Sequence, residues 1–130
     1  MNTAQRYAVE FTAGAEQDLD ELIGFVATSD SPGKAGALLD RLLATAQTLA
    51  TAPQRGSVPR ELQALGLRGY RQTMFKPYRI IYTVQETPRP AVFIVVVADG
   101  RRDMGTLLQR RLLAAPPAPD TDPDTDTDPA

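Results

Sequence analysis

The stretch GYRQTMFKPYRIIYTV, residues 69–84, has the pattern of two β-strands joined by a tight turn. Aromatic and β-branched residues are frequent in both halves, 69–75 and 78–84, and only Lys76 and Pro77 separate them. Two such runs with so short a connection predict a β-hairpin. Proline has no N–H for a sheet ladder, so Pro77 suits the turn. The sequence therefore predicts a sheet built around this hairpin.

Other segments extend the sheet or flank it. YAVEF at 7–11 predicts a first strand, and AVFIVVVAD at 91–99 is nearly unbroken apolar, which is typical of a strand covered on both faces. MGTLLQRRLLAA at 104–115 predicts a short final helix. The segment 53–67 is predicted to be a loop with a short apolar insert at Leu62, Leu65 and Leu67.

Two amphipathic helices are predicted ahead of the sheet. In 12–30, apolar residues recur at helical spacing and Thr12 is a candidate N-cap. In the second helix, Ser31 is the candidate cap, Pro32 takes the first helical position and Pro53 ends the helix. The two helices form a helical hairpin that must lay its apolar face on something, here the sheet.

Composition limits the chemistry that the chain can perform. With 130 residues, 42% of them hydrophobic, the chain has the size and apolar content of one domain. Cysteine and histidine are absent, which excludes disulfides, thiol catalysis and the commonest general base and metal ligand. We therefore expect no cofactor and no metal. We find neither a signal-peptide pattern nor an apolar run of about 20 residues, so we expect a soluble cytoplasmic protein outside the membrane.

Charge is distributed unevenly along the chain. Residues 1–67 carry five Lys and Arg against eight Asp and Glu, whereas 68–115 carry nine against three. The last fifteen residues, 116–130, consist mainly of Pro, Asp and Thr and contain five aspartates and no base. We expect a single domain over 1–115, with a basic second half, and a disordered acidic tail over 116–130. One hypothesis for the tail is a solubility appendage. Another, raised by opposite charge alone, is that the tail shields the basic half in cis.

The order of elements predicts an α+β fold. It comprises a small antiparallel sheet, an N-terminal helical hairpin packed on one face, and a short C-terminal helix. Five short motifs follow this order: Ala15, Asp18, Leu19 and Leu22; Pro53 and Gly56; Leu62, Leu65, Gly66, Tyr70 and Arg71; PYRI.Y from Pro77 to Tyr82; and GRRD from Gly100 to Asp103. With these motifs, about residues 7–113 resemble the RelE/ParE superfamily of toxins from bacterial type II toxin–antitoxin systems.

The resemblance implies a growth-inhibiting toxin held inactive by a cognate antitoxin in a hetero-oligomeric complex. RelE-type members are ribosome-dependent mRNA endonucleases, so this alternative implies the ribosome with mRNA as partner. ParE-type members poison DNA gyrase, which makes gyrase the implied protein target. A third alternative is a degenerate homologue that still binds an antitoxin and poisons nothing.

The residues available for catalysis favour the ParE-like interpretation. Cleaving RNA through its 2′-hydroxyl requires a base, an acid and cations that stabilise the phosphorane. The nuclease hypothesis takes these cations from Arg71, Lys76, Arg79 and Arg101, and it leaves Lys76 open as a candidate for the base. In RelE-like nucleases a tyrosine or histidine near the last helix commonly completes the site, but residues 104–107 here are Met, Gly, Thr and Leu. Glu61 and Glu86 lie in predicted loops, and nothing connects either to a phosphate. We therefore lean toward a toxin that is not an enzyme.

A binding function draws on the arginines of the second half. The candidate contacts for a target or an antitoxin are Arg71, Arg79, Arg101, Arg102, Arg110 and Arg111. Arg79 is either a solvated strand residue or part of a basic surface. If the predicted hairpin pairs symmetrically about Lys76 and Pro77, Arg71 lies near Arg79, and such a pair of like charges suggests an anionic partner.

The other candidate arginines have structural alternatives. The two arginines of GRRD stand beside Asp99 and Asp103, so an ion-pair cluster that fixes the turn competes with a target contact. Arg110 and Arg111 come at the end of the predicted last helix, where they favour the negative end of the helix dipole.

Overall fold

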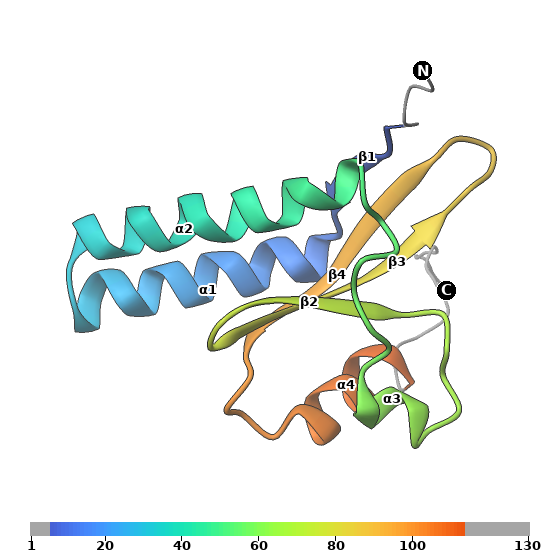
Figure 1. Ribbon diagram of the computed structural model, residues 1–130. Coiled ribbons are helices and arrows are strands. Elements are labelled where there is room, and N and C mark those ends of the chain that lie inside the picture. The colour runs from blue at the N-terminus through green and yellow to red at the C-terminus, as the bar shows by residue number, and fades with distance from the viewer. Residues whose placement is uncertain (1–5, 114–130) are drawn as a thin grey trace, which may run out of the picture.

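Helices and strands follow the predicted order (Figure 1). The structure is a computed structural model, and it describes residues 6–113. The elements are β1 (Ala8–Phe11), α1 (Ala13–Ser29), α2 (Pro32–Gln47), the 3₁₀ turn η1 (Thr48–Ala50), α3 (Arg60–Gln63), β2 (Arg71–Phe75), β3 (Tyr78–Gln85), β4 (Ala91–Asp99) and α4 (Met104–Leu112). The predicted tail, 116–130, lies outside the described residues, as do residues 114–115 of the predicted last helix.

Side-chain caps begin both helices of the helical hairpin, as predicted. The Thr12 hydroxyl accepts a hydrogen bond from the Ala15 N–H at 3.2 Å and starts α1. The Ser31 hydroxyl accepts one from the Lys34 N–H at 3.1 Å and starts α2. α2 passes into η1 before Pro53, so it is shorter than predicted because a tighter 3₁₀ turn replaces its end. No helix among residues 6–113 is long and apolar enough to cross a membrane.

The sheet is mixed, with strand order β1-β4-β3-β2. β2, β3 and β4 pair antiparallel, as predicted, whereas β1 pairs with β4 in parallel. The helical hairpin explains this difference, because its two antiparallel helices return the chain to the start of β1, where the Tyr7 N–H donates to the Ala50 carbonyl at 2.7 Å. The chain then enters the sheet again as β2, in the same direction as β1. Because β3 reverses this direction and β4 restores it, β4 runs parallel to β1.

Each face of the sheet is covered by helices. The helical hairpin covers one face, and α3 and α4 cover the other (Figure 1). Ile80 and Ile81 are neighbours in β3 and enter different cores, as the alternation of side chains along a strand requires. β4 contributes to both cores, which confirms that it is covered on both faces. The segment 53–67, predicted to be a loop, contains the single-turn helix α3. This helix is held in place by Leu62, which is fully buried against α4.

Candidate functional site

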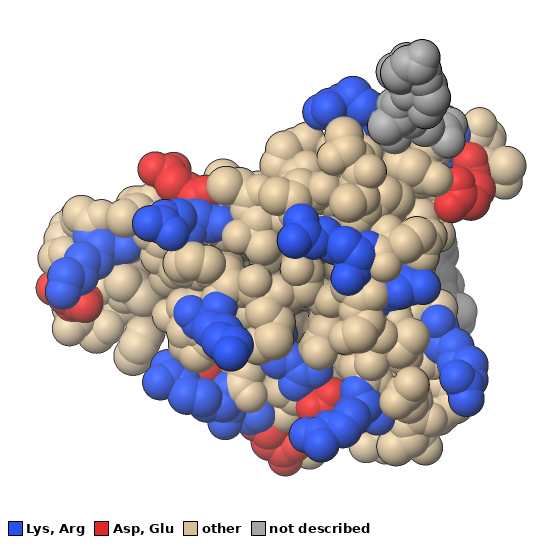
Figure 2. Space-filling model, in the orientation of Figure 1, with Lys and Arg blue, Asp and Glu red and all other residues tan. Residues whose placement is uncertain are grey.

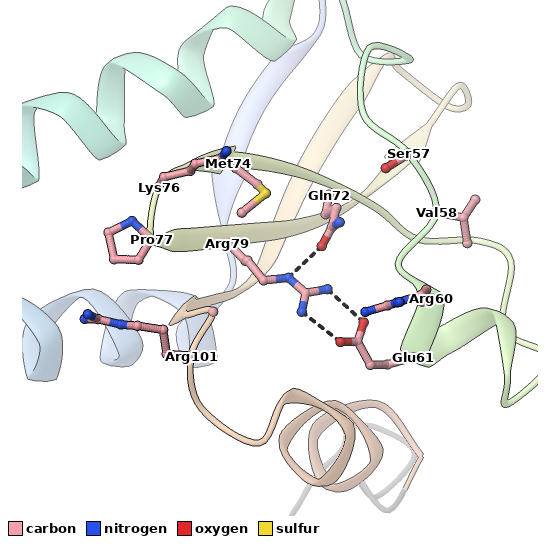
Figure 3. Close-up of a pocket in the computed structure, with 11 residues that line it drawn as sticks. Ser57, Val58, Arg60, Glu61, Gln72, Met74, Lys76, Pro77, Arg79 and Arg101 are labelled. Atoms are coloured by element: carbon pink, nitrogen blue, oxygen red, sulfur yellow. Dashed lines mark hydrogen bonds and ion pairs between the residues drawn. The ribbon is translucent and has the colours of Figure 1, made fainter.

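A cavity of about 550 Å³ lies on the face of the β2–β3 hairpin that turns away from the helical hairpin (Figure 3). Its walls come from β2 and β3, from the segment that leads into α3, and from the turn between β4 and α4. Of the residues that the structure describes, Glu61 is the one that contributes a carboxylate to the lining. Its Lys and Arg side chains are those of Arg60, Lys76, Arg79 and Arg101, and we call it the basic cavity.

Arg79 is buried in the wall of this cavity and held by two partners. Its Nη atoms donate to the two carboxylate oxygens of Glu61, each at 2.8 Å, and its Nε donates to Oε1 of Gln72 at 2.7 Å (Figure 3). Only 8% of Arg79 is exposed. A buried guanidinium needs a partner because desolvation penalises the charge, and a two-pronged carboxylate matches its geometry. The prediction that Arg79 is a solvated strand residue is therefore wrong, and its guanidinium lies in the wall of the basic cavity with its charge neutralised.

Gly100, the first residue of the GRRD motif, makes room for Arg79. A Cβ atom at Gly100 would lie 2.8 Å from Cδ of Arg79 and 2.9 Å from the Pro77 carbonyl oxygen. The Gly100 N–H donates to that same carbonyl oxygen at 2.7 Å. The PYRI.Y and GRRD motifs, which are separate in sequence, therefore meet at the Arg79 side chain.

The partnership with Arg79 decides what Glu61 can do. The hydrogen bonds from Arg79 lower the pKa of Glu61 from its ordinary value of 4.5 to about 2. The carboxylate therefore stays ionised at neutral pH, with both oxygens occupied. A general acid or base works best with a pKa near the operating pH. Glu61, which sequence reasoning could not connect to a function, is the counter-ion of Arg79 and is poorly suited to proton transfer.

Arg71 points to the other face of the sheet. It lies opposite Tyr82 in the β2–β3 pairing, on the helical-hairpin side, so the prediction that it lies near Arg79 is wrong. The Arg71 guanidinium donates to the Gly56 carbonyl at 2.6 Å. The Tyr82 hydroxyl donates to the Pro53 carbonyl at 2.8 Å and accepts from the Gly56 N–H at 3.1 Å, and burial raises its pKa. These bonds hold the segment before α3 against the sheet.

The arginines of the GRRD motif are exposed, and the two nearby carboxylates have separate partners. Arg101 donates to Asp99 at 2.9 and 2.6 Å, which lowers the pKa of Asp99. Asp103 instead caps α4 by accepting from the N–H and the hydroxyl of Thr106 at 3.1 and 2.8 Å, and these bonds lower its pKa. The predicted ion-pair cluster is thus limited to Asp99 and Arg101, and Arg102 forms no ion pair with a residue that the structure describes.

The two arginines at the end of α4 differ in their surroundings. Arg110 is exposed. Arg111 donates to the carboxylate oxygens of Asp18 in α1 at 2.9 and 3.1 Å and to the Val95 carbonyl at 2.8 Å. Asp18 also accepts from the Val97 N–H at 3.0 Å. The pairing of β1 with β4 ends at Ile94, so β1 leaves the edge of β4 open at Val95 and Val97. Arg111 and Asp18 bind the Val95 carbonyl and the Val97 N–H on this open edge.

Two cations of the basic cavity have no ion-pair partner in the part of the chain that the structure describes. Arg60 and Lys76 are exposed, and neither forms an ion pair within the described range, residues 6–113. Figure 2 shows many Lys and Arg side chains and few Asp and Glu on the face of the molecule that it presents. Arg60 and Gln72 were not among the predicted site residues. Pro59 could have pointed to Arg60, because it stands directly before the helical turn α3. A predicted helix there would have included Arg60 and Glu61.

A comparison with known protein families finds a match that covers most of the fold described above. The family model described as ParE toxin of type II toxin-antitoxin system, parDE, matches residues 9–104. This chain belongs to that ParE toxin family. The match runs from β1 to the start of α4 and includes every residue that lines the basic cavity. The resemblance found in the sequence motifs is thereby confirmed, with ParE as the branch.

Solved structures share the fold of this ParE-family chain. One is described as the chromosomal ParDE TA system from P. aeruginosa, with a TM-score of 0.60 and 15% identity, covering 73% of this chain and 97% of that chain. Another is the toxin-antitoxin complex RelBE2 from Mycobacterium tuberculosis, with a TM-score of 0.52 and 24% identity, covering 76% of this chain and 97% of that chain. At these identities the likeness shows the α+β fold alone. A comparison with curated proteins gave no match.

Proposed function

We propose that this ParE-family toxin inhibits bacterial growth by binding a protein target in the cytoplasm, without cleaving RNA itself. DNA gyrase is the target that the family resemblance implies. Of the predicted contact residues, Arg101, Arg102 and Arg110 are exposed and accessible to a partner. Three others are engaged inside the domain by hydrogen bonds, namely Arg71, Arg79 and Arg111.

The observation that carries this proposal is the pairing of Arg79 with Glu61. Cleavage of RNA needs an acid and a base for proton transfer, in addition to cations that stabilise the phosphorane. In the basic cavity the buried guanidinium is neutralised, and a carboxyl with a pKa of about 2 is a poor acid or base at neutral pH. Histidine is absent from the sequence. The cavity keeps exposed positive charge, which suits binding better than proton-transfer chemistry.

A cognate antitoxin is the second partner in the proposal. The two similar structures come from a toxin-antitoxin system and a toxin-antitoxin complex. We infer that this chain also forms a hetero-oligomer with an antitoxin. A small neighbouring gene that encodes a DNA-binding fold with an amphipathic tail is the expected source. Its co-expression should restore growth, and failure of every neighbouring gene to do so would count against this partner.

Pulse labelling after induction in bacteria tests the target. DNA and protein synthesis are followed in the same culture, and purified gyrase is then incubated with the full-length chain to look for trapped DNA cleavage. The proposal predicts that DNA synthesis falls first and that cleavage is trapped. Protein synthesis falling first, with cleavage of ribosome-bound mRNA, would support the RelE-like alternative. If neither falls, the degenerate homologue becomes the better account.

A double variant separates chemistry from folding. Arg79→Met combined with Glu61→Leu replaces the ion pair with apolar side chains, which proteins often tolerate far better than the loss of one partner. Under the proposal this variant, once circular dichroism shows it folded, still inhibits growth. If Arg79 instead stabilises a phosphorane, the folded double variant loses all activity.

A further inference from the structure

Among residues 6–113, the basic cavity finds counter-ions for only part of its charge. Glu61 neutralises Arg79, and Asp99 outside the lining neutralises Arg101. Lys76 and Arg60 have no carboxylate partner among residues 6–113. Cations that share one concave site raise the local concentration of anions. The cavity therefore offers a site for a segment that carries several negative charges.

The chain itself contains such a segment. Residues 6–113 hold all fourteen Lys and Arg and eleven of the sixteen Asp and Glu, so the described part has a net charge of +3. The other five acidic residues are aspartates placed at every second position from Asp120 to Asp128, with no base between them. The tail thus supplies an excess of negative charge that no side chain within it can neutralise.

The attachment point lies on the same side of the sheet as the cavity. α4, from which the tail continues, packs on α3 through the buried Leu62, Leu107 and Leu108. α3 in turn begins with Arg60 and Glu61, which line the cavity. Asp120 is the seventh residue after Leu113, and a stretch of this length can span about 23–25 Å when extended. A domain of this size has a radius of gyration of about 13 Å, so the span of this stretch is comparable with the dimensions of the domain.

The acidic tail is not expected to dock on α1, because α1 is itself negatively charged. α1 packs on the opposite face of the sheet from the cavity. α1 carries four carboxylates, at Glu16, Asp18, Asp20 and Glu21, and no base. Only Asp18 is paired with a cation among the described residues, by Arg111. An acidic segment is therefore repelled by α1 and attracted by the cavity. Tethering adds to this preference, because a segment of the same chain docks intramolecularly and is therefore present near the cavity at a high effective concentration.

We propose that the segment Asp120–Asp128 docks in cis on the basic cavity, with its carboxylates against Lys76 and Arg60. This contact goes beyond the proposed function and is independent of the target, because it is made within the isolated full-length chain. An antitoxin or target that needs the same cations competes with the tail.

A spin label on the tail tests the contact directly. The sequence has no cysteine, so Thr125→Cys in the full-length chain gives a single labelling site inside the acidic segment. Paramagnetic broadening of backbone amide signals in NMR spectra then reports which residues the label approaches. We expect several-fold stronger broadening at Lys76 and Gly100 than at Gly33 in the turn between α1 and α2. Salt at 1 M, where the screening length is about 3 Å, should remove the difference.

Matched variants decide whether charge and place are responsible. Replacing the five aspartates by asparagine should abolish the selective broadening, and Lys76→Gln with Arg60→Gln should reduce it several-fold. Arg68→Gln is the control, because Arg68 is exposed, forms no ion pair with a described residue and lies outside the cavity lining. Uniform broadening, persistence in the asparagine variant, or an equal loss with Arg68→Gln would each overturn the proposal. None of these outcomes depends on growth inhibition.

Discussion

At the scale of single residues, one carboxylate makes the buried Arg79 tolerable. Glu61→Ala removes the two acceptors at 2.8 Å and leaves Gln72 as the remaining side-chain partner of the guanidinium. We expect the free energy of unfolding to fall by about 2–3 kcal/mol, since a buried charge without its counter-ion keeps its desolvation cost. Urea titration followed by circular dichroism measures this loss. Asp40→Ala, at an exposed carboxylate of α2, should change stability by no more than about 0.5 kcal/mol, and equal losses would contradict the account.

The same residue predicts a pH dependence of stability. The folded-state pKa of Glu61, about 2, lies below its ordinary value of 4.5, so the folded protein binds this proton less readily than the unfolded chain. The resulting stabilisation is fully present above pH 4.5 and is lost as the pH falls toward 2. Urea midpoints of the wild type and Glu61→Gln should therefore differ most near neutral pH and converge between pH 4.5 and 2. A difference that stays constant with pH would show that this carboxylate does not titrate as described. Asp99 and Asp103 also have lowered pKa values, and the comparison of variants cancels their contribution.

At the scale of elements, side chains fasten α4 to α1 across the open edge of β4. Arg111→Met keeps an apolar stem but removes the bonds to Asp18 and to the Val95 carbonyl. We expect stability to fall by about 1.5–3 kcal/mol, and amide hydrogen exchange in α4 to quicken more than in α2. Arg110→Met, at the exposed neighbouring position, is the matched control and should leave both measurements nearly unchanged. If both variants exchange alike, the ion pair does not fasten the helix.

At the scale of the whole molecule, local signals predicted the order of elements but not the pairing of distant residues. Caps at Thr12 and Ser31 and the hairpin turn depend on neighbours in sequence, and the structure has all three. The burial of Arg79 could not be predicted, because its partner Glu61 lies eighteen residues earlier and approaches only when α3 packs below the sheet. The parallel pairing of β1 likewise depends on where the helical hairpin returns the chain. The basic second half was therefore visible in the sequence, while the neutralisation of its central charge was not.

The distribution of free charge over the whole molecule leads to a last prediction, at Lys76. As an exposed cation on a binding surface, it should contribute little affinity, because a rim charge at an interface adds about 0–1 kcal/mol. Lys76→Gln should therefore weaken growth inhibition by less than about tenfold, measured as colony counts across inducer concentrations at matched protein levels. If Lys76 were instead the general base of a nuclease, the loss would be about 10²–10⁴-fold. Lys34→Gln, at an exposed lysine on α2, is the control for removing a surface charge. A loss of a hundredfold or more at Lys76 alone would move the protein from a binding toxin to an RNA-cleaving one.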